Sequence, residues 1–513
     1  MSIEDIKSPL PARDYNIPEE ERSEDVSGDN SNRVAQINNP VSSEEGGGES
    51  QVTPEVKKSK KGLFVGGVGI ALLLLGFLGY KFLLPMLAPK EPEKVRLVYW
   101  GIWEEDAVIQ SAIADYTANN PHVEIVYKKN EPIDYRTRLK GRLLKSPDEV
   151  EVPDIFRIHN TWVQGFREEL APVPAGTVSN LQLDTDFFDV YKENLIVSGS
   201  YRAVPIMYDG MALFYNKDLI EAAAVKLPKT WWGLEAAAKK LTVKDENNKI
   251  QVSGVAMGLA ENVDHWSDIV GLMLMQNGVD LAVNDEVTNK KLTDVLTYYT
   301  IFRTKHEVWD ETLPSSTEFF ANGKLAFYFG PSWRVFNFND MNPSLRFEVT
   351  TVPQLPTLEG AELDQIESSE TNENITNIHW ASYWVEGVNV RGKNQEEAWK
   401  FLEHLAGKES LEKMYKAASD MRAFGEIYPR KSMADKIATN PKIKPFVSAA
   451  NNATSWYLCS RTADSSGVNE EMAGYFKDAI NSITQKNQAP ESVVGDLRNG
   501  INQLVLKYQI KKK

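Results

Sequence analysis

The sequence predicts an α/β protein of two or more folding units, preceded by a disordered tail and one transmembrane helix. Three observations lead to this prediction. Strand-like, helix-like and strand-like segments follow one another within residues 95–127, the pattern of a parallel sheet. The chain has 513 residues, too many for one compact core. An uncharged apolar run begins at Gly62 and is long enough to span a bilayer.

Residues 1–61 are predicted to form a disordered, acidic tail that ends in a basic cluster. Residues 1–56 contain thirteen Asp and Glu residues and only four Lys and Arg residues. Residues 42–50 contain only Ser, Glu and Gly, so ordering them would lose conformational entropy without burying apolar surface. Four lysines follow within residues 57–61.

The apolar run predicts a transmembrane helix over residues 62–88, in contact with membrane lipid. At about 1.5 Å per residue, the stretch from Gly62 to Tyr80 covers roughly 28 Å, close to the thickness of a bilayer core. The lysines of 57–61 place the N-terminus in the cytoplasm and the remainder outside the cell. A cleaved signal peptide is disfavoured because the run is too long and no clean small-residue cleavage site follows. Residues 89–94 form a proline-containing linker.

The chain beyond residue 94 mixes strand and helix patterns throughout. Residues 95–100 and 122–127 have the pattern of strands, and apolar residues recur at helical spacing over 107–119. Thr230 is placed to cap a helix, and residues 245–249 have the composition of a hairpin turn. This alternation indicates an α/β fold.

Composition disfavours several classes of function. The net charge of −15 argues against a nucleic-acid partner, which requires a basic face. Cys459 is the only cysteine, so an intramolecular disulfide and a cysteine zinc site are excluded, and a small buried residue is expected. The six histidines do not stand at metal-ligand spacing, and the common nucleotide-binding and hydrolase motifs are absent. We therefore expect no metal, no cofactor and no catalytic residues.

Seven segments occur in the order in which a known protein family has them. They include the strand–helix–strand unit with Trp-Gly-Ile-Trp at 100–103, the Tyr-Asn-Lys-Asp motif at 215–218, Pro-Lys-Thr-Trp at 228–231 and Gly-Pro-Ser-Trp at 330–333. The other segments are residues 135–139, 153–156, and 398–405 with 428–431. The chain therefore resembles the extracellular solute-binding proteins of bacterial ABC importers, in the sugar-binding group that includes the maltodextrin-binding proteins.

This resemblance implies a periplasmic-binding-protein-like fold, in which two α/β lobes joined by crossing hinge segments enclose a cleft. Residues 95–206 and 320–355 are expected to form the first lobe, and residues 207–319 and 356–510 the second. The resemblance also implies a monomer that captures a carbohydrate, such as an oligosaccharide, and delivers it to the permease subunits of an ABC transporter. Two alternatives stay open: a membrane-anchored sugar sensor, and a glycan-processing enzyme on the cell surface.

Candidate ligand contacts are aromatic and polar side chains in loops that follow predicted strands. Ligands of open α/β sheets lie at the carboxyl ends of strands, and a sugar requires flat aromatic faces with polar groups around its rim. The candidates are Trp103, Glu104, Asn160, Trp162, Tyr208, Asp209, Trp266, Trp333, Trp456, Tyr457 and Arg461. Structural roles are favoured for His159, His265 and Arg422, and core packing for Trp231, Trp232 and Trp399.

The resemblance to maltodextrin-binding proteins supports several of these candidates. A carboxylate follows the first crossover in that group, and Asp209 holds this place here. A Trp follows Gly-Pro, which corresponds to Trp333, displaced by one residue. A Trp-Tyr pair precedes an Arg, which corresponds to Trp456, Tyr457 and Arg461 with one additional residue between them.

Overall fold

A computed structural model describes residues 93–146, 148–357, 363–369 and 374–510, and residues Glu91–Lys513 form one compact unit. The predicted tail (1–61) and transmembrane helix (62–88) lie outside the described residues. Within the described part of the chain, no helix is both long and apolar enough to cross a bilayer.

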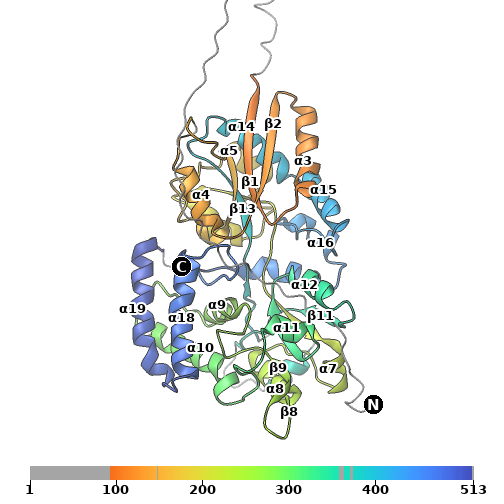
Figure 1. The fold of residues 1–513 in the computed structure, drawn as a ribbon, viewed down its shortest axis with the longest axis vertical. Helices are drawn as coiled ribbons and strands as arrows, with labels where there is room; N and C mark the ends of the chain where they lie inside the picture. Colours follow the sequence, from red (N-terminus) through yellow and green to blue (C-terminus); the bar gives the residue numbers. More distant parts are fainter. Residues whose placement is uncertain (1–92, 147, 358–362, 370–373, 511–513) are drawn as a thin grey trace, which may run out of the picture. The chain divides into compact units, whose positions relative to one another are not determined.

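Five strands form the sheet of the first lobe (Figure 1), in the order β2 (Val123–Asn130), β1 (Val95–Ile102), β3 (Ile155–His159), β13 (Trp384–Val388) and β6 (Val204–Pro205). β1 is parallel to β2 and β3, and β13 is antiparallel to β3 and β6. The predicted strand–helix–strand unit is confirmed, with α3 (Asp106–Asn119) between β1 and β2. Gly101 leaves room for Tyr127, since a Cβ there would lie 2.1 Å from the tyrosine hydroxyl.

Five further strands form the sheet of the second lobe, in the order β11 (Phe347–Thr350), β7 (Ala212–Asn216), β10 (Leu325–Gly330), β9 (Ile250–Val255) and β8 (Val243–Lys244). β7 is antiparallel to β10 and β11. The predicted hairpin is confirmed, because β8 and β9 pair as antiparallel strands.

The predicted lobe boundaries are wrong in two places. Residues 320–355 were expected in the first lobe, but β10 and β11 within that range pair with β7 of the second sheet. The chain returns to the first lobe only at β13, so residues 384–419 do not belong to the second lobe. Strand pairing between segments far apart in the sequence decides both points, and the local pattern of a strand carries no information about its partner.

Helices cover both sheets. Those of the first lobe are α3, α4 (Tyr135–Leu143), α5 (Ala175–Leu181), α6 (Val190–Leu195), α14 (Gln395–Leu405) and α15 (Lys408–Ser419), with α15 packed on α3. The two short strands β4 (Ile196–Val197) and β5 (Ser200–Tyr201) pair as a hairpin.

The helices of the second lobe are α7 (Lys217–Ala222), α8 (Trp231–Leu241), α9 (Trp266–Gln276), α10 (Glu286–Thr304), α11 (Ser316–Ala321), α12 (Arg334–Met341) and α13 (Leu363–Ser368), and the paired α18 (Val468–Thr484) and α19 (Pro490–Tyr508), which pack on α10. Between α15 and α18 lie α16 (Ala434–Ile437), α17 (Lys444–Ala449) and the 3₁₀ turns η4 (Lys431–Met433) and η5 (Ala450–Asn452).

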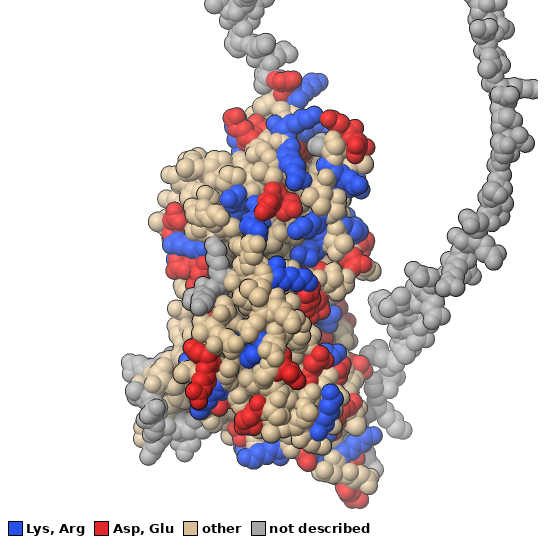
Figure 2. Space-filling model, turned by 90° about the vertical axis from the view of Figure 1, so that its left-hand side faces the viewer, with Lys and Arg blue, Asp and Glu red and all other residues tan. Residues whose placement is uncertain are grey.

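Local predictions for individual side chains have mixed outcomes. The hydroxyl of Thr230 accepts a hydrogen bond from the Gly233 amide and so caps α8. Trp231 and Trp399 are buried in the core, as expected, whereas Trp232 is 41% exposed because it faces outward from the first turn of α8. Cys459 is buried and free. On the face in Figure 2, Lys and Arg are interspersed with Asp and Glu, so this face has mixed charge.

Three chain segments connect the two lobes side by side, and we call them the connecting ribbon: residues 207–211, 379–383 and 453–455. The strands β12 (His379–Trp380) and β14 (Ala453–Thr454) pair within it. The Met211 amide donates to the Trp380 carbonyl, and the Ala381 amide donates to the Thr454 carbonyl, at 3.0 and 2.8 Å. The ribbon is therefore a small hydrogen-bonded unit against which both lobes pack.

Candidate ligand-binding site

A cavity of about 470 Å³ lies between the two lobes at the connecting ribbon, and we call it the central cavity. Its walls come from both lobes, because β3 ends at His159 on one side and β10 ends at Gly330 on the other. The lining residues from the first lobe and its loops are Trp103, Arg157, His159, Trp384, Arg422, Phe424, Gly425 and Glu426. Those from the ribbon and the second lobe are Met207, Asp209, Gly210, Met211, His265, Asp268, Pro331, Ser332, Trp333, Arg334, Phe336, Trp380, Ser382, Ser460 and Arg461.

Aromatic side chains make up much of this lining. Trp103 is 45% exposed at the cavity and meets the edge of Trp384 at a ring-centroid distance of 6.0 Å. Phe336 of α12 lies 4.5 Å from Phe424. One face of Trp333 is covered by the guanidinium of Arg334, at 4.5 Å. These rings provide flat apolar surfaces, which can pack on the C–H faces of a ligand.

Three residues that line the cavity have strained backbones. Trp103, His265 and Arg461 have φ angles of 71°, 61° and 57°, in the left-handed region that non-glycine residues avoid. Such conformations cost roughly 1–3 kcal/mol each and persist where the surroundings enforce them, commonly at ligand sites. Strain at three lining residues agrees with a ligand site at this cavity, although positive φ angles also occur at residues outside it.

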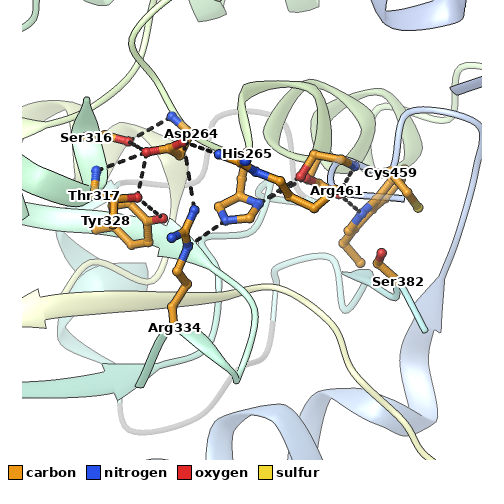
Figure 3. Close-up of polar contacts among 12 residues, drawn as sticks. Asp264, His265, Ser316, Thr317, Tyr328, Arg334, Ser382, Cys459 and Arg461 are labelled. Atoms are coloured by element: carbon orange, nitrogen blue, oxygen red, sulfur yellow. Dashed lines mark hydrogen bonds and ion pairs between the residues drawn. The ribbon is translucent and has the colours of Figure 1, made fainter. Parts of the chain in front are cut away.

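The second-lobe wall contains a polar network centred on Asp264 and His265 (Figure 3). Asp264 accepts hydrogen bonds from the Thr317 hydroxyl at 2.5 Å and from Arg461 at 2.8 Å. Burial opposes ionisation of Asp264, but these bonds and the charge of Arg334 hold its pKa below the usual value. The same network fixes Arg334 at the edge of the cavity.

His265 is neutral, with its proton on Nδ1. Arg334 can only donate, and its Nε lies 3.0 Å from His265 Nε2, so Nε2 accepts. Nδ1–H then donates to the Ser460 hydroxyl at 2.8 Å. Burial lowers the pKa of His265, which agrees with an uncharged ring.

Two buried carboxyl groups line the floor of the cavity. Asp209 Oδ1 accepts from the amides of Gly210 and Ser332 at 2.8 and 3.0 Å, and burial raises the pKa of this group to about 7. Asp268 Oδ1 accepts from Trp380 Nε1 at 2.9 Å, and its buried Oδ2 lies 3.5 Å from His265 Nδ1. The carboxyl group of Asp209 can also accept a hydrogen bond from a ligand hydroxyl.

The first-lobe wall contains two sets of paired charges. Arg157 of β3 donates to Glu386 of β13 at 2.7 Å, and both side chains are buried. Arg422 donates to Glu426 at 2.7 Å and lies 3.6 Å from Glu104. The pKa of Glu104 is raised to about 7, mainly because the group is buried and secondly because the negative charge of Glu426 lies nearby.

The eleven predicted contacts separate into three groups. Four line the central cavity: Trp103, Asp209, Trp333 and Arg461. Three line a different cavity, of about 870 Å³: Asn160, Trp456 and Tyr457. Four line neither of these cavities: Glu104, Trp162, Tyr208 and Trp266.

The four remaining residues are held elsewhere by packing. Glu104 is buried in a small neighbouring cavity beside Glu426. Trp162 stacks on Phe166 in the core, Tyr208 packs on Phe188, and Trp266 is partly buried against the core. None of these four side chains therefore lines the central cavity, and their contact with a ligand stays a prediction.

Several cavity residues were missed by sequence reasoning. Arg157, Asp268, Arg334, Trp380 and Trp384 line the cavity but were not among the candidates. Arg157 lies within a strand that is buried on both faces, so no alternation distinguished it. The aromatic run at residues 379–384, together with Arg334 directly after Trp333, was the available signal. His159, His265 and Arg422, for which structural roles were favoured, also line the cavity.

The family described as bacterial extracellular solute-binding protein matches residues 111–445, more than half of the chain. The chain belongs to this family. The resemblance inferred from the ordered motifs is thus confirmed. Two relatives named as binding proteins, from Brucella abortus (strain 2308) and Brucella suis biovar 1 (strain 1330), are each 21% identical over 352 residues, which are 67% of this chain and 77% of theirs.

Solved structures share the fold of this solute-binding protein at low identity. A cyclo/maltodextrin-binding protein complexed with maltotetraose aligns with a TM-score of 0.61 and 16% identity, covering 83% of this chain and 100% of that chain. The maltose-binding periplasmic protein of Listeria monocytogenes, in complex with maltose, aligns with the same TM-score and identity, covering 82% of this chain and 100% of that chain. The sugar-binding protein of Xanthomonas citri also has this TM-score and identity, covering 81% of this chain and 98% of that chain. These likenesses establish a two-lobed α/β fold.

Proposed function

We propose that this solute-binding protein captures a short saccharide in the central cavity. The proposal rests on the lining of that cavity. Six Trp and Phe rings line it together with arginine donors and carboxyl acceptors. A pyranose has apolar C–H faces and a rim of hydroxyls, which such a lining complements. The volume of about 470 Å³ falls within the usual range for small-molecule sites. The structural relatives complexed with maltose and maltotetraose support a saccharide.

The remainder of the proposal concerns the place and partners of the protein. The chain acts as a monomer outside the cell, held at the membrane by the helix at 62–88. The lobes close on the solute about the connecting ribbon, and the closed form delivers it to the permease subunits of an ABC transporter. Family membership supports this sequence of events, and tethering keeps the receptor concentrated near the membrane.

The test is the melting temperature of the full chain, in a detergent without a sugar headgroup, against a panel of mono- and oligosaccharides. Amino acids, polyamines and glycerol phosphate serve as the comparison ligands. A ligand that binds only the folded state stabilises it by roughly 2.7 kcal/mol at a hundredfold excess over Kd. We expect a saccharide to raise the melting temperature, and Trp384→Ala to abolish that shift. Shifts with the comparison ligands alone would exclude a sugar, and cleavage of a saccharide would favour an enzyme.

A further inference from the structure

A second cavity, of about 870 Å³, lies along the edge of the connecting ribbon formed by residues 453–455, and we call it the lateral cavity. It shares no lining residue with the central cavity, although the two sites adjoin. His159 lines the central cavity and the next residue, Asn160, lines the lateral one. Both lobes contribute to its walls, through residues 160–164 and 189–197 on one side and residues 275–280 on the other.

Six carboxamide side chains line the lateral cavity. They are Asn160, Gln164, Asn194, Asn377, Asn451 and Asn452. Each carboxamide offers both hydrogen-bond donors and acceptors. No Lys or Arg is among the described residues that line this cavity, in contrast to the four arginines of the central cavity.

Several of these polar groups are not used by the fold. The side chains of Gln164, Asn451 and Asn452, and the hydroxyl of Tyr457, make no hydrogen bond to any described residue, whereas Asn160 and Asn194 bond to each other. Gln164 comes from the first lobe, and the other three follow α17. Uncommitted donors and acceptors thus face one cavity from two directions.

An aromatic pair completes the lining. The rings of Trp456 and Tyr457 meet edge to face at 5.4 Å. Trp456 is nearly fully buried, so its position is fixed by the surrounding core. The partly exposed ring of Tyr457 beside carboxamides suits a ligand with C–H faces and hydroxyls. Three carboxylates also line this cavity: Asp189, Glu193 and Asp280. Asp189 pairs with Lys192 and Lys431, each at 3.2 Å, while Glu193 accepts from the Thr454 hydroxyl and Asp280 from the Ala282 amide.

We propose that the lateral cavity is a second binding site, specific for a neutral saccharide or a similar polyhydroxylated molecule. Carboxamides can satisfy ligand hydroxyls in both directions without requiring a charge on the ligand, and the absence of Lys and Arg from its described lining disfavours anions. The proposal goes beyond the function proposed above, because capture in the central cavity requires no ligand at this second site.

The test counts bound saccharide by equilibrium dialysis of the full chain, in a detergent without a sugar headgroup, against radiolabelled maltose and radiolabelled raffinose. The lateral variant combines Gln164→Ala and Asn452→Ala, which remove uncommitted side chains. The central variant is Trp384→Ala. Gln488→Ala removes an exposed carboxamide between α18 and α19, outside both cavities, and serves as the matched control. Melting temperatures establish that each variant is folded.

We expect two separable binding events. One is abolished by Trp384→Ala, and the other is weakened about tenfold or more by the lateral variant, as expected for two lost hydrogen bonds, and is unaffected by Trp384→Ala. Gln488→Ala should leave both unchanged. Binding that only Trp384→Ala abolishes would overturn the second site and leave the proposed function intact. Binding that only the lateral variant weakens would retain the second site and remove support for the central one. The absence of saturable binding of either saccharide would overturn the second site.

Discussion

The two walls of the central cavity hold their charges in different ways. On the first-lobe wall, Arg157 and Glu386 occupy opposed positions on β3 and β13, so the sheet itself fixes the pair. On the second-lobe wall, Asp264, Arg334 and Arg461 come from three separate segments, and Arg461 is 60% exposed. The comparison teaches that the charge pair of the first-lobe wall is buried and costly to alter, whereas the second-lobe wall includes an exposed pair that is less costly to lose.

The largest expected effect comes from the buried pair. Glu386→Gln leaves the charge of Arg157 without its partner in the core, which costs roughly 3–5 kcal/mol of unfolding free energy. Urea denaturation measures this loss. Glu396→Gln, which breaks an exposed pair with Lys400, is the matched control and should change stability by less than about 0.5 kcal/mol. Equal losses in the two variants would remove the distinction between buried and exposed pairs.

An intermediate effect is expected from Glu104 on the first-lobe side. Its pKa is raised from 4.5 to about 7 in the folded state, so the folded protein binds more protons than the unfolded one between these values. Stability therefore falls as the pH rises from about 4.5 to about 7, by up to roughly 3 kcal/mol for this group. Asp209, whose pKa is also raised, contributes in the same direction. Glu104→Gln should reduce the slope of stability against pH, and an unchanged slope would contradict the assignment.

The smallest effect is expected from the second-lobe wall. Arg461→Gln breaks the 2.8 Å contact with Asp264, but solvent screens this pair and Arg334 remains nearby. The unfolding free energy should fall by about 0.5 kcal/mol or less, as measured by the same denaturation experiment. A loss comparable to that of Glu386→Gln would mean that the pair of the second-lobe wall is as costly to lose as that of the first.

The class of fold could be predicted from the sequence, because its signals are local. Helical spacing over 107–119, the cap at Thr230 and the hairpin at 245–249 all depend on neighbouring residues. The assignment of residues 320–355 to a lobe failed because β10 and β7 pair across more than a hundred residues. The residues within a strand do not by themselves determine which sheet the strand joins.

The candidate site was predicted only in part, for a related reason. Asp209 follows a crossing segment, where the rule for open sheets applies, and it lines the central cavity. Trp456 and Arg461 are five residues apart, yet they line different cavities, because the chain turns at residues 457–458 between them. Trp162 also follows a strand but stacks inward on Phe166. A sequence identifies the loop and does not identify the direction of each side chain.

One close approach in the second lobe restricts how this chain can evolve. α9 lies against the indole of Trp380, whose Nε1 is held by Asp268, and a Cβ at Gly271 would lie 2.5 Å from the ring. No larger residue fits at position 271 while a tryptophan occupies position 380. Among descendants of a common ancestor, the two positions should covary, and a bulkier residue at 271 should occur only where a smaller one has replaced Trp380.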